Sequence, residues 1–418
     1  MSRFSFFLRQ ILNTMWFLPA AFSAGALVTI ALALFIARWA PNELPWTISQ
    51  EAVQSILEIL ATSLLTVSVF ALSTLVSALA SASSSTSPRA VSLIVADRAA
   101  QTSISVFIGA FLFSILAILG LSAGIYGSAS RLLLFSVTLL VVAIVIAALI
   151  RWIAQISDIG RVSHTLERVE SATEVALTRL REHPLFDCAA LHDEPRGQPI
   201  HSGQLGYVQH FDVARLDKLA GEHNLRVAVL AMPGAYASPV RPLMMVEGEL
   251  TEELVSDLSG AFVVGDTRTF ENDPRFGLSV LAEIADKALS PAVNDAGTAI
   301  DVVGRITRLL SGWDPRQTSA AQYQHVMVRQ LSASDLIEDA FRPIARDGAG
   351  TIEVVLRLLY SLEVISRSNP FFRQEAIDAA RDAVSRSEKV LTAEADLEAL
   401  RQASWFTQSG SPGRLSAQ

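Results

Sequence analysis

Residues 56–80 read ILEILATSLLTVSVFALSTLVSALA, and this stretch decides the architecture of the chain. A helix needs about 20 apolar residues to cross the ~30 Å hydrocarbon core of a bilayer. Comparable apolar runs occupy residues 17–37, 104–123 and 132–150, and none follows them. The sequence therefore predicts an α-helical membrane domain with four transmembrane helices, followed by a large water-soluble domain.

Composition separates these two parts of the chain. The 418 residues are 51% hydrophobic with a mean hydropathy of +0.39, and the apolar excess lies almost entirely before Arg151. The remainder has interspersed charges and enough length for a hydrophobic core of its own. The formal net charge of −8 and the lack of a Lys/Arg stripe argue against a nucleic acid as partner. A single cysteine, Cys188, cannot form an internal disulfide.

Arginines in the short loops predict the orientation. They lie before the first apolar run, between the second and third, and after the fourth, whereas the two opposite loops carry few. By the positive-inside rule, both termini then lie in the cytoplasm. The first run is longer than the h-region of a signal peptide, which has about 7–15 residues, so we expect it to remain as an uncleaved span.

The run at 56–80 differs from the other three because polar residues follow one of its helical faces. Spacings of three, four and seven residues place them on a single stripe. One interpretation is close packing of small residues between helices, with the hydroxyls bonded within the bundle. The other is a hydrated path for a small solute or ion, because an intramembrane carboxylate costs roughly 2–4 kcal/mol unless it meets water or a partner. This polar stripe consists of Glu58, Thr62, Thr66, Ser73 and Ser77.

Ser87 and Pro88 mark the end of this run. Serine followed by proline is typical of an N-cap with proline at the first helical position, and it predicts a new helix through Arg98 that leads into the third span. Pro88, Arg89 and Arg98 are therefore expected at the cytoplasmic face of the membrane. There the arginines would anchor the helices; binding of lipid headgroups or docking of a partner is the alternative.

The chain after the membrane domain is expected to be a mostly helical α+β domain with a stalk. The predicted segments are a membrane domain at 1–155, a stalk helix and linker at 156–202, a barrel-like β/α module at 203–248, a helical domain at 249–404 and a disordered tail at 405–418.

The module at 203–248 is predicted from three short strands around a helix. Strands are expected at 206–211, 225–231 and 240–246, with a Pro233-Gly234 turn between the last two. This pattern resembles half of the barrel-sandwich fold of biotinyl and lipoyl carriers. Those carriers attach the cofactor to a lysine at a hairpin tip, where this chain has Arg241. We therefore expect no covalent cofactor.

Nothing in the sequence points to catalysis. The seven histidines include no pair with the three- or four-residue helical spacing that would place two imidazoles on one metal ion. Walker A and G-x-G-x-x-G motifs are absent from the sequence. We expect no enzyme activity, no metal site and no cofactor.

The densest group of polar residues in the second half lies around a predicted helix-to-helix corner. A helix is expected to begin after Asp273 and to stop at Ser290-Pro291, and Asn294 or Asp295 is expected to cap the next helix. Local caps alone explain this pattern, and a binding role for the corner is the alternative. The motif residues are Asp273, Phe276, Ser290, Pro291, Asn294, Asp295 and Thr298.

Several motifs together resemble the bacterial predicted membrane proteins catalogued as domain of unknown function 2254. They are the S-S-x-x-S-P-R end of the second span, the S-G-x-x-G-Y-V start of the soluble part, the P-G turn, and D-P-x-F-G-L-x-x-L-x-x-I-A-x-x-A-L-S-P-A-x-N-D-x-x-T-A. The family's usual S-x-F-S-P-R reads Ser84-Ser85-Thr86-Ser87-Pro88-Arg89 here and lacks the aromatic residue. The resemblance implies a bacterial inner membrane protein and brings no assigned activity.

The sequence favours an oligomeric channel or transport-like protein whose cytoplasmic domain serves gating or assembly. The lipid bilayer and further copies of the chain are the expected partners, with a small solute or ion of unknown identity. A membrane scaffold or sensor that transports nothing is the alternative. A wet path along the polar stripe would favour the first function, and a dry, packed stripe the second.

Overall fold

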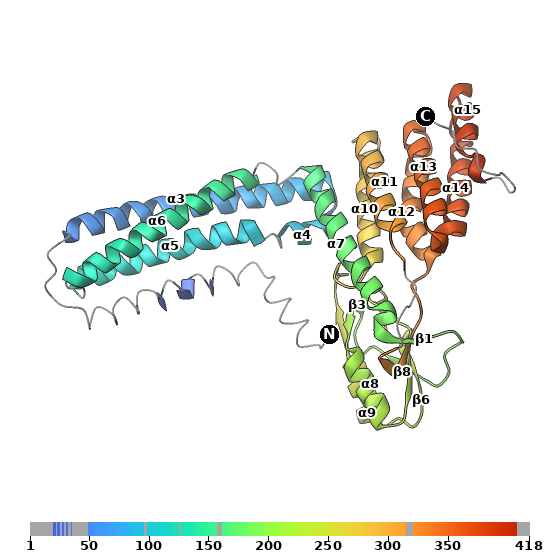
Figure 1. The fold of residues 1–418 in the computed structure, drawn as a ribbon, viewed down its shortest axis with the longest axis horizontal. Helices are drawn as coiled ribbons and strands as arrows, with labels where there is room; N and C mark the ends of the chain where they lie inside the picture. Colours follow the sequence, from blue (N-terminus) through green and yellow to red (C-terminus); the bar gives the residue numbers. More distant parts are fainter. Residues whose placement is uncertain are drawn as a thin grey trace. The chain divides into compact units, whose positions relative to one another are not determined.

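The computed structural model describes residues 49–95, 98–124, 126, 128–156, 161–314 and 321–407, together with single positions between residues 20 and 35. The chain divides into two compact units, with the boundary between Thr165 and Leu166. Figure 1 shows the helices and strands of both units. The first predicted span, residues 17–37, lies mostly outside the described residues, as does the end of the predicted tail from residue 408.

Three helices in the described part of the N-terminal unit are long and apolar enough to cross a membrane. Their candidate spans are Gln50–Ser81, Gln101–Ser122 and Arg131–Ala154. The first of these helices contains neither glycine nor proline, so nothing interrupts its hydrogen bonding over 36 residues. The three helices are α3 (Gln50–Ser85), α5 (Arg98–Ser122) and α6 (Ser128–Ile156).

Apolar side chains hold these three helices together. Val53, Leu57 and Leu64 of α3 are buried, and Phe107 and Phe113 of α5 belong to the same two hydrophobic clusters. Large apolar side chains on the other faces of α3 and α6 are exposed, as they must be on helices that contact lipid. The unit is therefore built as a membrane bundle rather than as a water-soluble one.

The C-terminal unit contains two rows of helices. One row consists of α10, α12 and α14, the other of α11, α13 and α15, and neighbours within and between the rows are in contact. Their apolar faces pack inward, so this half of the unit has a core of its own. The bounds are α10 (Pro274–Leu289), α11 (Ala296–Ser311), α12 (Ala333–Asp347), α13 (Ile352–Ser368), α14 (Arg373–Ser387) and α15 (Glu394–Ala403), with η3 (Pro370–Phe372) and η4 (Trp405–Thr407).

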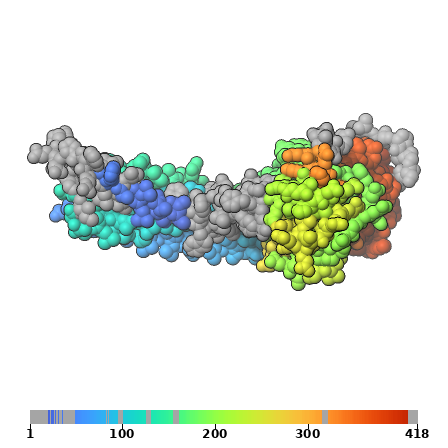
Figure 2. Space-filling model, turned by 90° about the horizontal axis from the view of Figure 1, so that it is seen from below, coloured from blue at the N-terminus to red at the C-terminus, as the bar shows by residue number. Residues whose placement is uncertain are grey.

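Two open sheets form the other half of the C-terminal unit. A mixed sheet has the order β1-β8-β4-β6-β2, and an antiparallel sheet has the order β5-β3-β7. In Figure 2, the atoms of α8 (Val213–Glu222) and α9 (Glu252–Ser259) show in green and yellow on this half. The strands are β1 (Cys188–Ala190), β2 (Gln198–His201), β3 (Gly206–Phe211), β4 (Arg226–Val229), β5 (Tyr236–Ala237), β6 (Pro242–Glu247), β7 (Phe262–Gly265) and β8 (Tyr323–Val328).

The predicted barrel-sandwich at 203–248 is not what these residues form. The three strands that were expected to close on one another are divided between the two sheets, β3 in one and β4 with β6 in the other. The physical reason is that strands from outside the segment pair with them. β8 adds to β4 as a parallel neighbour, and β7 adds to β3.

Two further sequence predictions need correction. The linker expected within residues 156–202 contains the turn η2 (Pro184–Asp187) and the strands β1 and β2. The helix expected from Pro88 through Arg98 is instead a short η1 (Pro88–Ala90) and α4 (Val91–Val95), and α5 begins at Arg98. Residues 96 and 97, between α4 and α5, are outside the described ranges.

Candidate functional site

The polar stripe of α3 lies on a face that the described bundle leaves uncovered. Glu58, Thr62, Thr66, Ser73 and Ser77 are all exposed. The residues of α3 that are buried are apolar and lie on the opposite side of the helix; they include Val53, Leu57, Ala61, Leu64, Ala71 and Leu75. The hydroxyls of the stripe therefore do not hold α3 against α5 and α6.

The stripe keeps part of its hydrogen-bonding capacity free. Thr66 Oγ1 donates to the carbonyl of Thr62 at 3.1 Å, and Gln54 Nε2 donates to Glu58 Oε1 at 2.9 Å. Within the described chain, the hydroxyls of Thr62, Ser73 and Ser77 donate no hydrogen bond. A polar face of this kind is unfavourable against lipid, and it needs water or a second protein surface.

Ser87 is an N-cap, as the sequence predicted, and it caps the short η1 that follows α3. The hydroxyl oxygen of Ser87 accepts a hydrogen bond from the backbone N–H of Arg89 at 3.1 Å, and Pro88 occupies the first position of η1. Thr86 and Ser87 are buried, whereas Arg89 is exposed. The serine is thus a structural cap, and it does not contribute a free polar group to the surface.

The most distinctive motif of the soluble part contains the whole of α10 and the residues that cap its two ends. Asp273 caps the start of α10, and Ser290 is its C-cap. Sixteen residues at 1.5 Å each separate these ends by about 24 Å. The structure therefore does not bring Asp273 and Phe276 together with the corner residues, and two separate sites have to be considered.

The corner between α10 and α11 is held by local hydrogen bonds. Asp295 is the N-cap: its carboxylate accepts from the backbone N–H of Thr298 at 3.0 Å and from Oγ1 of Thr298 at 2.6 Å. These bonds lower the pKa of the Asp295 carboxyl. Asn294 has a left-handed backbone with φ of +52°, and its N–H donates to the carbonyl of Ser290 at 2.9 Å. Pro291, Asn294 and Asp295 are exposed.

At the other end of α10, Asp273 forms a buried ion pair with Arg268. Nε and Nη2 of the guanidinium donate to the two carboxylate oxygens at 2.8 and 3.0 Å, and the carboxylate is 2% exposed. Arg268 also lies over the ring of Phe276, 5.0 Å from its centroid. Burial raises the pKa of the Asp273 carboxyl, and Arg268 only partly offsets this effect. Both charges therefore depend on their mutual bidentate contact.

The Pro233-Gly234 turn closes over this ion pair. Gly234 has φ of +91°, and a Cβ atom placed on it would lie 2.1 Å from Oδ2 of Asp273. Its N–H donates to the carbonyl of Val208 at 2.8 Å, which fixes the turn to β3. Two motifs that lie about 40 residues apart in the sequence thus meet here, and only glycine fits between them.

Arg275, two residues after Asp273, extends the charged network to α12. Its Nε donates to Asp339 at 2.6 Å and its Nη1 to Asp335 at 2.8 Å. Ser332 caps α12 next to these aspartates by accepting from the N–H of Asp335 at 3.4 Å. The starts of α10 and α12 are therefore joined through one arginine.

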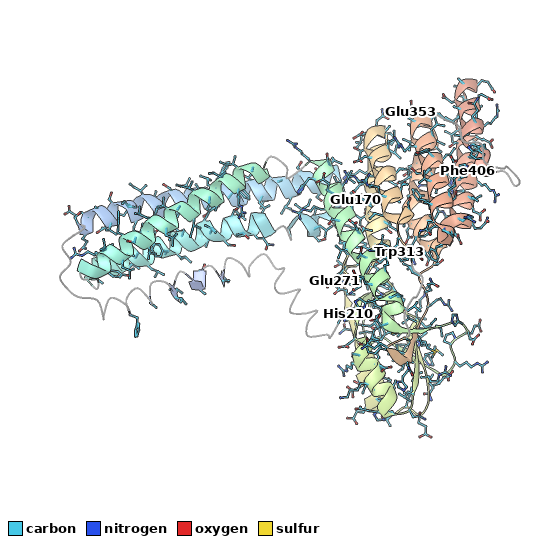
Figure 3. All side chains as sticks on the ribbon, viewed as in Figure 1. Glu170, His210, Glu271, Trp313, Glu353 and Phe406 are labelled. Atoms are coloured by element: carbon cyan, nitrogen blue, oxygen red, sulfur yellow. The ribbon has the colours of Figure 1, made fainter. Side chains whose placement is uncertain are left out.

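The helix α7 (Val162–Glu182) packs along this network with its residues from Leu166 onward. Arg179 Nη1 donates to the carbonyl of Glu271 at 2.6 Å and to Oδ1 of Asn272 at 3.1 Å. Trp313 Nε1 donates to the carbonyl of Leu177 at 2.9 Å. Figure 3 labels Glu170 on this helix and Glu271 and Trp313 beside it. The helix that follows the last candidate span is thus bonded to the two residues just before Asp273 and to Trp313.

A cavity of about 490 Å³ opens between these elements, wholly within the C-terminal unit. Its charged lining residues are Arg268, Asp273, Arg275, Arg329, Asp335 and Asp339, and its apolar lining comes from α7, η2, the P-G turn and Trp313. This volume is typical of small-molecule sites, which measure about 300–1,000 Å³.

Sequence reasoning found Asp273 and Phe276 but missed most residues around them. Arg329, Asp335 and Asp339 lie more than 50 residues further along the chain. They line the same cavity as Asp273 because distant segments pack together, among them α12 against α10, and no local pattern records those contacts. The Pro233-Gly234 turn was the one available signal, because a glycine after proline predicts a turn.

Comparison with known proteins identifies the family of this chain. A family model described as Predicted membrane protein (DUF2254) matches residues 12–364, which is most of the sequence. The chain belongs to this family. The match confirms the resemblance that the motifs suggested, and it covers both the stripe and the cavity of this DUF2254 protein.

The curated relatives are themselves without an assigned function. An uncharacterized protein of Mycobacterium tuberculosis is 31% identical over 119 residues, which is 27% of this chain and 23% of that protein. An uncharacterized protein of Mycobacterium bovis matches to the same extent. The chain thus spans less than a quarter of the length of these relatives. No solved structure matches the chain.

Proposed function

We propose that this DUF2254 protein forms an oligomeric path for a small solute or ion across the bacterial inner membrane. The observation that carries the proposal is the exposure of all five polar stripe residues on a helix that is otherwise apolar enough to span a bilayer. Contact with lipid is energetically unfavourable for a carboxylate and for hydroxyls without hydrogen-bond partners. Several copies that turn their stripes toward one another would surround a polar path instead.

The proposed path requires several subunits for a geometric reason. A four-span bundle has little room for a pore within one chain, and the described helices α3, α5 and α6 already fill their shared interior with apolar side chains. A path between copies requires no opening of that interior. Hydroxyls along such a path can replace part of the hydration shell of a passing ion, and Glu58 would favour cations.

The loop arginines support an orientation with the C-terminal unit in the cytoplasm. In that arrangement the C-terminal unit is the assembly or gating domain, because α7 follows the last span, packs closely against α10 and is bonded to α11. Its Glu170 accepts from Arg305 at 2.6 Å and pairs with Arg308 at 2.9 Å. A change at the cavity would therefore act on the helix that follows the last span.

A sensor that transports nothing is the second candidate, favoured by the ligand-sized cavity in the C-terminal unit. Planar-bilayer recording of the purified full chain in potassium chloride separates the two. The path predicts a discrete conductance, with cation preference reduced by Glu58→Gln and unchanged by Thr74→Val, which lies on α3 outside the stripe. Inserted protein that conducts nothing would contradict the path and favour the sensor.

A further inference from the structure

The cavity beside Asp273 has one wall that is apolar. Leu180, Phe186, Leu230, Met232, Trp313 and Leu331 form it. Trp313 is 4% exposed and its indole N–H is already bonded to Leu177, so it presents its ring and no free polar group. This wall suits the hydrocarbon or aromatic body of an organic molecule.

The other wall carries three arginines and three aspartates, and two of these arginines are bonded to the aspartates. Arg268 neutralises Asp273, and Arg275 lies between Asp335 and Asp339. Arg329 lines the same cavity, is exposed, and forms no ion pair with any described residue. Arg329 is therefore the lining arginine whose guanidinium group stays available to a ligand. An anion gains a charge-assisted hydrogen bond there.

The backbone at the rim is held in an uncommon conformation that supplies part of the apolar wall. Leu185, Phe186 and Asp187 have φ of +53°, +56° and +63°. For residues other than glycine this left-handed region is unfavourable, and it persists where the surroundings hold it in place. Here the Phe186 ring packs 5.1 Å from Phe211, and the carbonyl of Asp187 accepts from the N–H of Gln322 at 2.9 Å. The turn thus presents Leu185 and Phe186 to the cavity.

From these observations we propose that the cavity binds an organic monoanion, a carboxylate with an apolar body, whose charged group bonds to Arg329. Planar guanidinium and carboxylate groups match in a bidentate geometry, and the apolar body would lie against Trp313 and Phe186. The inference stands on the cavity alone and holds whether or not the protein conducts. The bound molecule would contact Leu180 at the end of α7, so binding has a direct way to influence that helix.

Titration calorimetry on the full chain in nanodiscs tests the proposal. The probe is 4-phenylbutyrate, and the matched neutral probe is 4-phenylbutyramide, which has the same body without the charge. Nanodiscs without protein give the background from partitioning into lipid. We expect one carboxylate bound per chain, and at least tenfold weaker binding of the amide.

Variants assign the charge to Arg329. Arg329→Gln should weaken binding of the carboxylate at least tenfold, while Arg329→Lys, which keeps the charge, should retain most of it. Arg342→Gln is the control, since Arg342 is an exposed arginine of α12 outside the cavity. Unchanged thermal midpoints show that the variants are folded. Equal binding of acid and amide, full binding by Arg329→Gln, or no binding of the carboxylate at millimolar concentration would each overturn the proposal.

Discussion

Thr173 of α7 and Gly277 of α10 lie in direct contact, and a Cβ atom placed on Gly277 would be 2.0 Å from Oγ1 of Thr173. Thr173 cannot easily move away, because it is buried and its hydroxyl donates to the carbonyl of Val169 at 2.6 Å. The close approach of these two helices places Arg179 within reach of Glu271 and Asn272. Because Gly277 has no side chain, α7 can thus pack closely against α10.

We therefore expect Gly277→Ala to destabilise the C-terminal unit by about 1–3 kcal/mol, the usual range for overpacking. Gly304→Ala is the matched control. Gly304 lies in the interior of α11, and a Cβ atom placed on it would meet no neighbouring atom within 4 Å, so alanine should stabilise that helix by up to about 1 kcal/mol. Thermal unfolding of the two variants would show opposite shifts. A loss of stability in both, or in neither, would contradict the packing described here.

The corner between α10 and α11 should lose stability when its cap is removed. Asp295→Ala deletes the acceptor of two hydrogen bonds from Thr298, so we expect a cost of about 0.5–2 kcal/mol. Asn294→Gly should be neutral or slightly stabilising, since glycine adopts φ of +52° without strain, whereas Asn294→Ala should cost about 1 kcal/mol. If stability stayed constant while a cellular phenotype disappeared, the exposed corner would be a binding site.

Asp286 should make stability depend on pH. Burial, and then the charge of Asp347, raise the pKa of the Asp286 carboxyl to about 6, well above its value of roughly 3.9 in an unfolded chain. The folded chain then binds a proton more tightly than the unfolded chain between pH 4 and 6. Stability contributed by this group is therefore present at low pH and is lost as the pH rises through this window.

The isosteric variant Asp286→Asn isolates this contribution. It should be more stable than the parent by about 1–2 kcal/mol at pH 7.5, and the difference should vanish near pH 4, where both side chains are neutral. Arg346 keeps Asp347 as a partner at 2.6 Å in the variant. Glu338→Gln, an exposed change on α12, serves as control. A difference in thermal midpoint that did not change with pH would contradict the raised pKa.

Periodic and capping signals made part of this structure predictable. Long apolar runs identified α3, α5 and α6, and side-chain caps placed the starts of α10 and α11 close to where Asp273 and Asp295 begin them. These features depend on neighbours within a few residues. The sheets depend on distant ones: β8 lies some 95 residues after β4 and still pairs with it in parallel, so its short sequence carried no sign of a partner.

The two candidate sites also differ in whether they depend on nearby or on distant residues of the sequence. The polar stripe follows from helical spacing alone, and its exposure on α3 agrees with that spacing. The cavity required contacts between α7, α10, α12 and the P-G turn, which no single segment of sequence encodes. Arg329 in particular follows β8, an element that the sequence did not reveal, so its place in the lining of the cavity could not be foreseen.

The stripe of α3 provides the most direct test of a hydrated path. Single cysteines at Thr62, Thr66 and Ser73 can be treated in cells with a membrane-impermeant thiol reagent in a Cys188→Ala background. The native thiol is itself buried, and burial raises the pKa of Cys188 to about 12, so replacing it removes little reactivity. Ala123→Cys, in the exposed turn after α5, is the positive control, and Leu72→Cys, on the apolar face of α3, is the lipid-facing control.

A path that is open to water predicts labelling at the three stripe positions and at Ala123→Cys, with protection at Leu72→Cys. Packing of the stripe against another helix predicts protection at every position in the membrane. If Thr62→Cys, Thr66→Cys and Ser73→Cys all stay unlabelled in cells where Ala123→Cys reacts, the stripe does not line a path and the proposed transport function is contradicted.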